Sequence, residues 1–162
     1  GRVLGMHQGI ALSTIGQRRR LNIPSPVPMY VLRILPEENA IIVGTEDQLY
    51  EREMWVGDVV WSSIPELTKP LKVMAKIRYN MPAAPAKVFP TEREDQVRVV
   101  FDQPVRAITP GQIAVFYRGE TVVGGGTILA PNQIEVDSET TEQAVKRALQ
   151  RVQPFMLEGA IE

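Results

Sequence analysis

Residues 71–79 read LKVMAKIRY, and apolar and basic side chains alternate along this stretch. Because strand side chains point to opposite faces with a period of two, positions 73, 75, 77 and 79 are expected on one face, and Lys72, Met74, Lys76 and Arg78 on the other. The pattern predicts an amphipathic strand. Tyr79 can be interpreted as a core residue of that strand, or as an exposed ring that stacks on a nucleic acid base.

Short apolar runs broken by Pro and Gly lie on both sides of this strand. Residues 29–35 and 39–44 predict a hairpin whose turn is 36–39. Further strands are predicted at 87–89, 96–101, 107–108 leading into 111–117, and 121–129, with a tight turn at 118–120. The predicted fold class is mainly β: a small antiparallel β-barrel as the C-terminal domain, preceded by a small β-rich central domain, with a C-terminal helix.

The domain boundaries follow polar breaks in the sequence. We expect a central domain at 1–48, a C-terminal β-barrel at 49–134 and a helical extension at 135–162. In the extension, Thr140 and Gln143 fit a capping box and Pro154 would end the helix. An apolar stripe at helical spacing is formed by Ala144, Val145, Ala148, Leu149 and Val152.

The composition excludes several classes of site. The 162 residues include no cysteine and one histidine, His7, which excludes disulfides, thiolate metal sites and cysteine nucleophiles and argues against a His-based metal cluster or catalytic triad. There is no run of 18 apolar residues, so no membrane-spanning helix is expected. The first five residues lack a signal-peptide pattern, and we therefore expect a cytoplasmic protein with no membrane partner.

The formal net charge of −1 hides separate charged blocks. Residues 1–20 carry +4 and residues 69–90 carry +5, both without an acidic residue, whereas residues 30–68 carry −6. The two basic blocks could face phosphate groups. They could equally be solvated strand faces balanced by acids elsewhere.

Two glycine-containing segments could carry function. GMHQG at 5–9, followed by STIGQRRR at 13–20, could hold phosphate or a polar ligand, although it lacks the spacing of a P-loop. The alternative is an exposed basic turn with His7 as a structural residue. TPGQ at 109–112 predicts a turn, and the glycine triplet 124–126 predicts a bulge or a close approach of two backbones.

In order along the chain, these motifs resemble those of the tRNA-specific 2-thiouridylase family. The resemblance runs from about Gly5 to Ile128, roughly three quarters of the chain. The matching pieces are His7–Gly9, Thr14–Arg18, Pro28–Val31, Val43–Gly44, Lys76–Tyr79, Val99–Tyr117 and Gly124–Ile128.

The resemblance implies a tRNA-binding portion of an enzyme that thiolates the C2 position of the wobble uridine. In that family ATP adenylates the C2 oxygen and a cysteine persulfide delivers the sulfur. The S-G-G-x-D-S loop and the two catalytic cysteines of the family's nucleotide-binding domain are absent from this sequence. The fragment is therefore expected to be inactive and without a cofactor, whereas the parent enzyme uses ATP and a sulfur-donor protein.

The family's tRNA-contacting positions correspond to Arg78, Tyr79 and Gln112, which are expected to touch the anticodon arm. Thr14, Gln17 and Arg18 are expected to help shape the uridine pocket.

The sequence departs from the family pattern in two places. Arg20 and Asn22 stand where the family usually has glycines. Asn80 and Met81 replace a more polar, basic pair after the K-x-R-Y motif.

Two other functions are compatible with parts of the sequence. One is a stand-alone β-barrel that binds RNA or protein without enzymatic activity. The other is a carboxylate-based enzyme that uses a pair of acids from residues 37–66, although no pair there stands out by spacing or setting.

Overall fold

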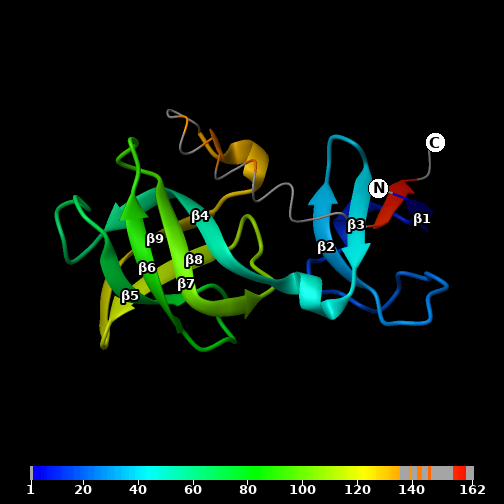
Figure 1. Ribbon diagram of the computed structural model, residues 1–162, viewed down its shortest axis with the longest axis horizontal. Coiled ribbons are helices and arrows are strands. Elements are labelled where there is room, and N and C mark those ends of the chain that lie inside the picture. Colours follow the sequence, from blue (N-terminus) through cyan, green and yellow to red (C-terminus); the bar gives the residue numbers. More distant parts are fainter. Residues whose placement is uncertain (1, 136–138, 140–141, 144–145, 147–154, 160–162) are drawn as a thin grey trace. The chain divides into compact units, whose positions relative to one another are not determined.

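The computed structural model describes residues 2–135, 139, 142, 143, 146 and 155–159 (Figure 1). The chain divides into two compact units. The first, here called the sheet unit, consists of Gly1–Tyr50 and Arg151–Glu162, and the second, the barrel unit, consists of Glu51–Gln150.

The sheet unit contains a four-stranded sheet with the order β1-β10-β3-β2. Its strands are β1 (Val3–His7), β2 (Tyr30–Leu35), β3 (Ala40–Gly44) and β10 (Phe155–Gly159). The 3-10 helix η1 (Ile10–Leu12) lies between β1 and β2, and η2 (Glu46–Leu49) follows β3. The predicted hairpin is confirmed, since β2 and β3 pair antiparallel. Asn39 closes its turn with a φ of 46° and donates its backbone N–H to Pro36 O at 3.1 Å.

The core of the sheet unit comes from the hairpin and the loop before it. Val31, Ile41 and Val43 are fully buried. The loop is attached to the hairpin by two backbone hydrogen bonds, from Gly16 N to Val31 O and from Val31 N to Gln17 O. The loop that contains the TIGQR motif is therefore part of the folded unit.

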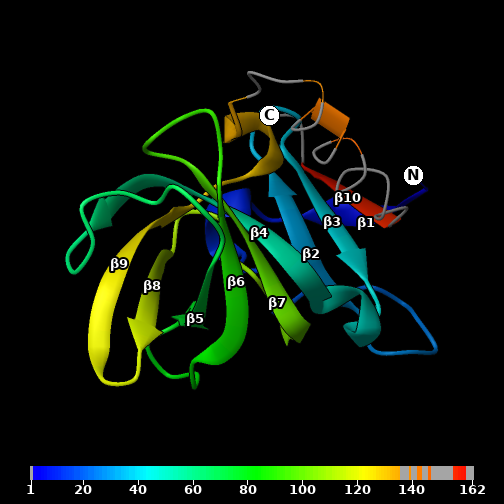
Figure 2. The same cartoon turned by 60° about the vertical axis from the view of Figure 1, so that its left-hand side comes forward.

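The barrel unit is a closed six-stranded barrel with the order β4-β7-β6-β5-β8-β9, in which β9 also pairs with β4 (Figures 1 and 2). Its strands are β4 (Tyr50–Trp61), β5 (Leu71–Lys76), β6 (Ala84–Pro90), β7 (Val97–Arg106), β8 (Ile113–Arg118) and β9 (Thr121–Ile128), followed by the 3-10 helix η3 (Pro131–Gln133). The prediction of a mainly β chain with an antiparallel barrel is confirmed.

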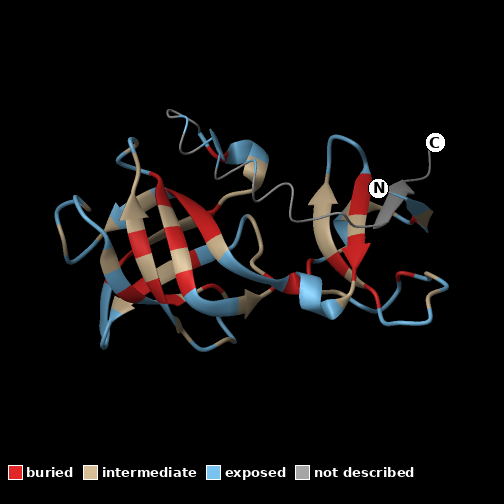
Figure 3. Cartoon of the chain, in the orientation of Figure 1, coloured by how far each residue is buried: buried red, intermediate tan, exposed pale blue. Residues whose placement is uncertain are grey.

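Alternating burial along the barrel strands produces the core. Bands of buried and less buried residues cross β6 and β7 in Figure 3. Val88 and Val99, which are paired across these strands, and Phe116 on β8 are fully buried. In β5 the predicted alternation holds, because Val73 and Ala75 point inward and Lys72 is exposed.

The glycine triplet of β9 lies where backbones approach closely, as the sequence predicts. A Cβ placed on Gly125 would lie 2.5 Å from Ala114 O, and one on Gly124 would lie 2.6 Å from Val60 O. A Cβ on Gly126 would collide with the carbonyl oxygen of Gly57. Side chains at these positions would push β8 and β4 away from β9.

Two local strand predictions are wrong, and one of the two interpretations of Tyr79 is excluded. Ala107 and Ile108 do not form a strand: β7 ends at Arg106, and Ala107 has a φ of 57°, which lies in the left-handed region. Tyr79 is not a core residue. The strand β5 ends at Lys76, and the Tyr79 side chain is 97% exposed.

The predicted C-terminal helix falls mostly outside the described residues, including its apolar stripe, Thr140 and Pro154. Glu139, Glu142, Gln143 and Lys146 are described and have helical backbone. An ion pair of 2.5 Å joins Lys146 to Glu142 one turn earlier. No helix in the described part of the chain is long and apolar enough to cross a membrane.

Candidate nucleic-acid interface

Arg78 and Tyr79 lie in a tight turn that follows β5. The turn is closed by a hydrogen bond of 3.2 Å from Met81 N to Arg78 O. At its tip, the ring of Tyr79 is almost fully exposed, and Lys76 Nζ lies 5.6 Å from the ring centroid. This distance allows a cation–π contact, and it leaves a positively charged group beside an open aromatic face.

The guanidinium of Arg78 turns back onto the protein. Arg78 Nη2 donates to Thr109 Oγ1 at 2.6 Å and to Ala107 O at 3.3 Å. Thr109 Oγ1 in turn donates to Ala107 O at 2.9 Å. Arg78 therefore holds the 107–109 segment in place, including the strained backbone of Ala107.

The TPGQ turn presents Gln112 on a fixed backbone. Gly111 adopts a φ of 87°, which glycine tolerates without steric cost. Gly111 N donates to Ile128 O at 2.8 Å, and Ile128 N donates to Gln112 O at 2.9 Å. The Gln112 side chain is exposed, so its amide is available to a ligand.

Strand pairing explains why the two turns are neighbours. Met74 pairs with Tyr117, and Lys76 pairs with Val115, in the antiparallel pairing of β5 and β8. β5 ends at Lys76 and β8 begins at Ile113, so the turn after β5 and the turn before β8 lie at the same end of this strand pair. The structure therefore places Arg78, Tyr79 and Gln112, the three residues that the sequence selects, at one end of the β5–β8 pair.

A basic strip runs along the outer face of the barrel toward this end. Lys72 and Lys87 lie directly opposite each other on β5 and β6. Within the described residues, neither they nor Lys76 has an ion-pair partner. Like charges that face each other across a strand pair are destabilising, and a bound anion would remove that repulsion.

The second group of predicted residues, Thr14, Gln17 and Arg18, lies in the sheet unit. The amide of Gln17 is used inside the loop, since its Oε1 accepts from Thr14 N at 3.0 Å and its Nε2 donates to Arg19 O at 2.8 Å. Gln17 thus shapes the loop. Thr14 and Arg18 are exposed.

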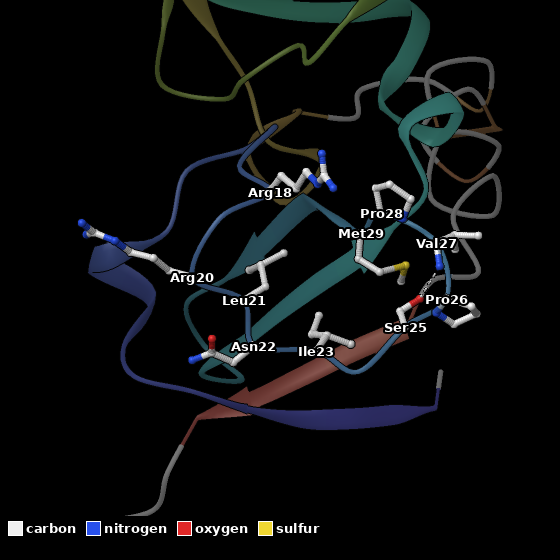
Figure 4. Close-up of a pocket in the computed structure, with 10 residues that line it drawn as sticks. All are labelled: Arg18, Arg20, Leu21, Asn22, Ile23, Ser25, Pro26, Val27, Pro28 and Met29. Atoms are coloured by element: carbon white, nitrogen blue, oxygen red, sulfur yellow. Dashed lines mark hydrogen bonds between the residues drawn. The ribbon is translucent and has the colours of Figure 1, made fainter.

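Arg18 lines a surface pocket of about 360 Å³ formed by the segment that follows it (Figure 4). Its walls include Leu21, Ile23 and Met29, and Arg20 extends its guanidinium away from the other labelled side chains. Thr14 and Gln17 do not line this pocket. Of the three residues, Arg18 is therefore the one that lines this pocket.

The same pocket contains Arg20 and Asn22, the first of the two places where the sequence departs from the family pattern. Arg20 has a φ of 67° and Asn22 a φ of 50°, so both adopt the left-handed conformation that favours glycine. The backbone at these two positions thus has the left-handed conformation that a glycine, the residue expected there from the resemblance, adopts without steric cost. The substitutions add a cation and an amide to it.

His7 is a structural residue. It is 9% exposed, its Nδ1 accepts from Gly9 N at 3.0 Å, and its Nε2 lies 2.9 Å from Asn39 O. These two contacts fix the tautomer with the proton on Nε2. Among the described residues, no group of three or more acidic or histidine side chains is placed to hold a metal ion.

Sequence reasoning missed two residues at this site, Thr109 and Lys87. Thr109 belongs to the predicted TPGQ turn, but only the structure shows that its hydroxyl accepts a hydrogen bond from Arg78. Lys87 belongs to the basic block 69–90, but only the pairing of β5 with β6 shows that it lies opposite Lys72.

Comparison with known protein families gives two matches that together cover most of the chain. Residues 1–45 match the family described as tRNA methyl transferase PRC-barrel domain. Residues 51–128 match the family described as aminomethyltransferase beta-barrel domain. The two matches meet near the boundary between the sheet unit and the barrel unit.

Individual relatives are similar over about four fifths of the chain. The chain is 48% identical over 128 residues to the tRNA-specific 2-thiouridylase MnmA of Halothermothrix orenii, which is 79% of this chain and 36% of the relative. The proteins of the same name from Acetivibrio thermocellus (48% identical, 79% of this chain and 35% of the relative) and Symbiobacterium thermophilum (49%, 79% and 33%) are similar to the same degree. The match therefore spans about a third of the length of these relatives.

Proposed function

Because the chain is a homologue of the tRNA-specific 2-thiouridylases over their PRC-barrel and C-terminal β-barrel domains, we propose that it is the tRNA-binding portion of such an enzyme. The resemblance predicted from the sequence is thereby confirmed. We propose that the turns and the basic strip at this end of the barrel bind RNA, and that the target is the anticodon arm of tRNA. A protein with this function would be cytoplasmic, where tRNA is found.

The observation that carries the proposal is the exposure of Tyr79. Tyr79 is 97% exposed and contributes nothing to the core, and here its ring lies beside Lys76, at the same end of the β5–β8 pair as the turn that carries Gln112. Aromatic rings next to cations are typical of surfaces that stack unpaired RNA bases and hold their phosphates. Anticodon loops offer unpaired bases of this kind.

Each residue has a distinct part in the proposed contact. Tyr79 stacks on a base, the Gln112 amide binds base edges or backbone, and the strip of Lys72, Lys76 and Lys87 attracts phosphates. Arg78 positions the two turns, because its Nη2 is already bonded to Thr109 and Ala107.

The test is binding of an anticodon stem-loop to the chain as a function of salt. Tyr79→Ala should weaken binding about tenfold, because one stacked base is worth about 1–3 kcal/mol. Changing Lys72 and Lys87 to Gln should lower the slope of log K against log salt by about 0.7–0.9 for each lost phosphate contact. Arg118→Gln is the matched control, since Arg118 ends β8 at the opposite end from Gln112 and is exposed.

Arg78 is tested by comparing Arg78→Lys with Arg78→Ala. Lysine keeps the charge and loses the fork, so a positioning role predicts that both variants weaken binding to a similar degree with an unchanged salt slope. Equal affinity of wild type and the Tyr79, Lys72 and Lys87 variants, all folded, would show that this face is merely solvated.

We further propose that the chain alone does not thiolate tRNA. It has no cysteine to carry a persulfide and no S-G-G-x-D-S loop to bind the pyrophosphate of ATP. In the parent enzyme the nucleotide-binding domain would supply the cysteines and the loop, and a separate sulfur-donor protein would supply the sulfur. Formation of 2-thiouridine in tRNA by the purified chain with ATP and a persulfide donor would contradict this.

A further inference from the structure

The sheet of the sheet unit is completed by a strand that is distant in sequence. β10 lies between β1 and β3, parallel to the first and antiparallel to the second (Figure 1). On the β3 side the register runs from Phe155↔Val43 to Glu158↔Ala40. Among the described strands, β10 is the only neighbour that β1 has in the sheet.

The strand β10 lies outside both family matches. The matches cover 1–45 and 51–128, so β1, β2 and β3 belong to the first match and residues 155–159 to neither. Within the described residues, the sides of β1 and β3 that face each other across this gap have β10 as their partner, so without β10 the gap would be one strand wide.

The segment that leads to β10 is anchored to the barrel unit. Gln96, which is 3% exposed, donates to Glu135 O at 3.0 Å and accepts from Glu135 N at 3.0 Å. Arg93 forms an ion pair of 2.5 Å with the carboxylate of the same residue. Glu135 is therefore held in place on the barrel unit.

We propose that the gap between β1 and β3 is a strand-acceptor site for an extended peptide, and that residues 155–159 of the same chain occupy it. Main-chain hydrogen bonds on both sides supply the affinity in such sites, as in other cases of strand addition to a sheet edge. The site differs from a simple edge because its occupant bonds to two strands at once.

Occupancy of this site has a consequence for the neighbouring loop. β1 ends at His7, and the chain continues directly into the loop that contains the TIGQR motif and Arg18. One end of β1 is fastened to the β2–β3 turn by His7 and Asn39. The rest of β1 depends on β10, so we infer that the occupant holds this loop in its observed arrangement.

The experiment is amide hydrogen exchange of the full chain with Leu157→Pro and Glu158→Pro together. Adjacent residues of a strand donate to opposite sides, so the two prolines remove one N–H facing β1 and one facing β3. Alternate amides of Ala40–Val43, those that face β10, should exchange about tenfold faster or more. The intervening amides, which face β2, and those of Val99 and Phe116 in the barrel should keep their rates.

The matched control is the double change Leu157→Ala and Glu158→Ala, which keeps both N–H groups and should leave exchange nearly unchanged. Addition of a synthetic peptide with the sequence of residues 151–162 to the proline variant should restore slow exchange. Sedimentation of the wild type should give the mass of a monomer.

Three results would overturn the proposal. Unchanged exchange in the proline variant would mean that β10 is not needed, and equally fast exchange of all β2 and β3 amides would mean that no separate acceptor site exists. A dimer whose dissociation releases the alternate β3 amides would mean that the occupant comes from a second copy. None of these results depends on RNA binding.

Discussion

Replacing Thr109 by valine should weaken the link between Arg78 and the 107–109 segment while keeping the volume of the side chain, because the bond from Arg78 to Ala107 O would remain. The change deletes the acceptor of the 2.6 Å bond from Arg78 and the donor of the 2.9 Å bond to Ala107 O. A hydrogen bond to a charged group contributes about 1.5–3 kcal/mol and a neutral one about 0.5–1.5 kcal/mol. Both residues are half-buried, so water can replace part of this, and we expect a loss of about 2 kcal/mol in the free energy of unfolding.

Urea denaturation followed by tryptophan fluorescence measures this loss in the barrel unit selectively. The chain has two tryptophans, Trp55 and Trp61, and both lie on β4. With a urea dependence of about 1–3 kcal/mol per molar, the midpoint should fall by about 1 M. Thr68→Val is the control, because Thr68 is exposed in a loop and has no side-chain hydrogen bond within the described residues.

A double-mutant cycle with Arg78→Met isolates the pair itself. If the hydroxyl positions the guanidinium, the two changes together should cost about 1–2 kcal/mol less than the sum of the single changes. Strict additivity, or a Thr109→Val midpoint equal to that of Thr68→Val, would refute the reasoning. The contact between Arg78 and Thr109 would then contribute nothing to the stability of the barrel.

Two further changes test the backbone arguments. Gly125→Ala should lower the free energy of unfolding of the barrel by about 1–3 kcal/mol in the same urea assay, because its Cβ would lie 2.5 Å from Ala114 O. The control is Val122→Ala at an exposed position of the same strand, which should cost less than about 1 kcal/mol. Arg20→Gly should change the free energy of unfolding of the sheet unit by no more than about 0.5 kcal/mol in a thermal melt. Arg20→Val should lower it by about 1–2 kcal/mol, because a β-branched residue tolerates a φ of 67° poorly. Equal melting temperatures for the two variants would contradict the strain argument.

The strands with regular alternation could be predicted from the sequence. Residues 71–76 alternate because one face of β5 packs on the core. The prediction fails at Tyr79 because alternation applies only while the strand continues, and the chain turns after Lys76. The same turn exposes the ring of Tyr79, which is part of the candidate RNA-binding site.

The longest strand was missed for a related reason. In β4 the residues Met54–Gly57 are buried in succession, and Asp58 follows with a φ of 49°. The register with β9 shifts between Gly57 and Val60. This irregularity breaks the period of two that marks a strand in a sequence.

The strand β10 had no local signal that a sequence pattern could reveal. Its five residues pair with residues more than a hundred positions earlier, so its structure depends on the slot that it enters rather than on its own propensity. The candidate RNA-contacting residues, by contrast, could be selected from short motifs. The hydrogen bond from Arg78 to Thr109, which links the two turns, could not be predicted from those motifs.

The position of β10 also makes the barrel unit an insertion within the sheet unit. On a ribosome, Ile42 emerges long before Met156, its partner in the sheet, and the whole barrel is made in between. Contacts of such high sequence separation form slowly, so the barrel should fold first while β1 and β3 wait with unpaired edges. A mutation that slows folding of the barrel would therefore prolong the time during which the other unit is prone to aggregate.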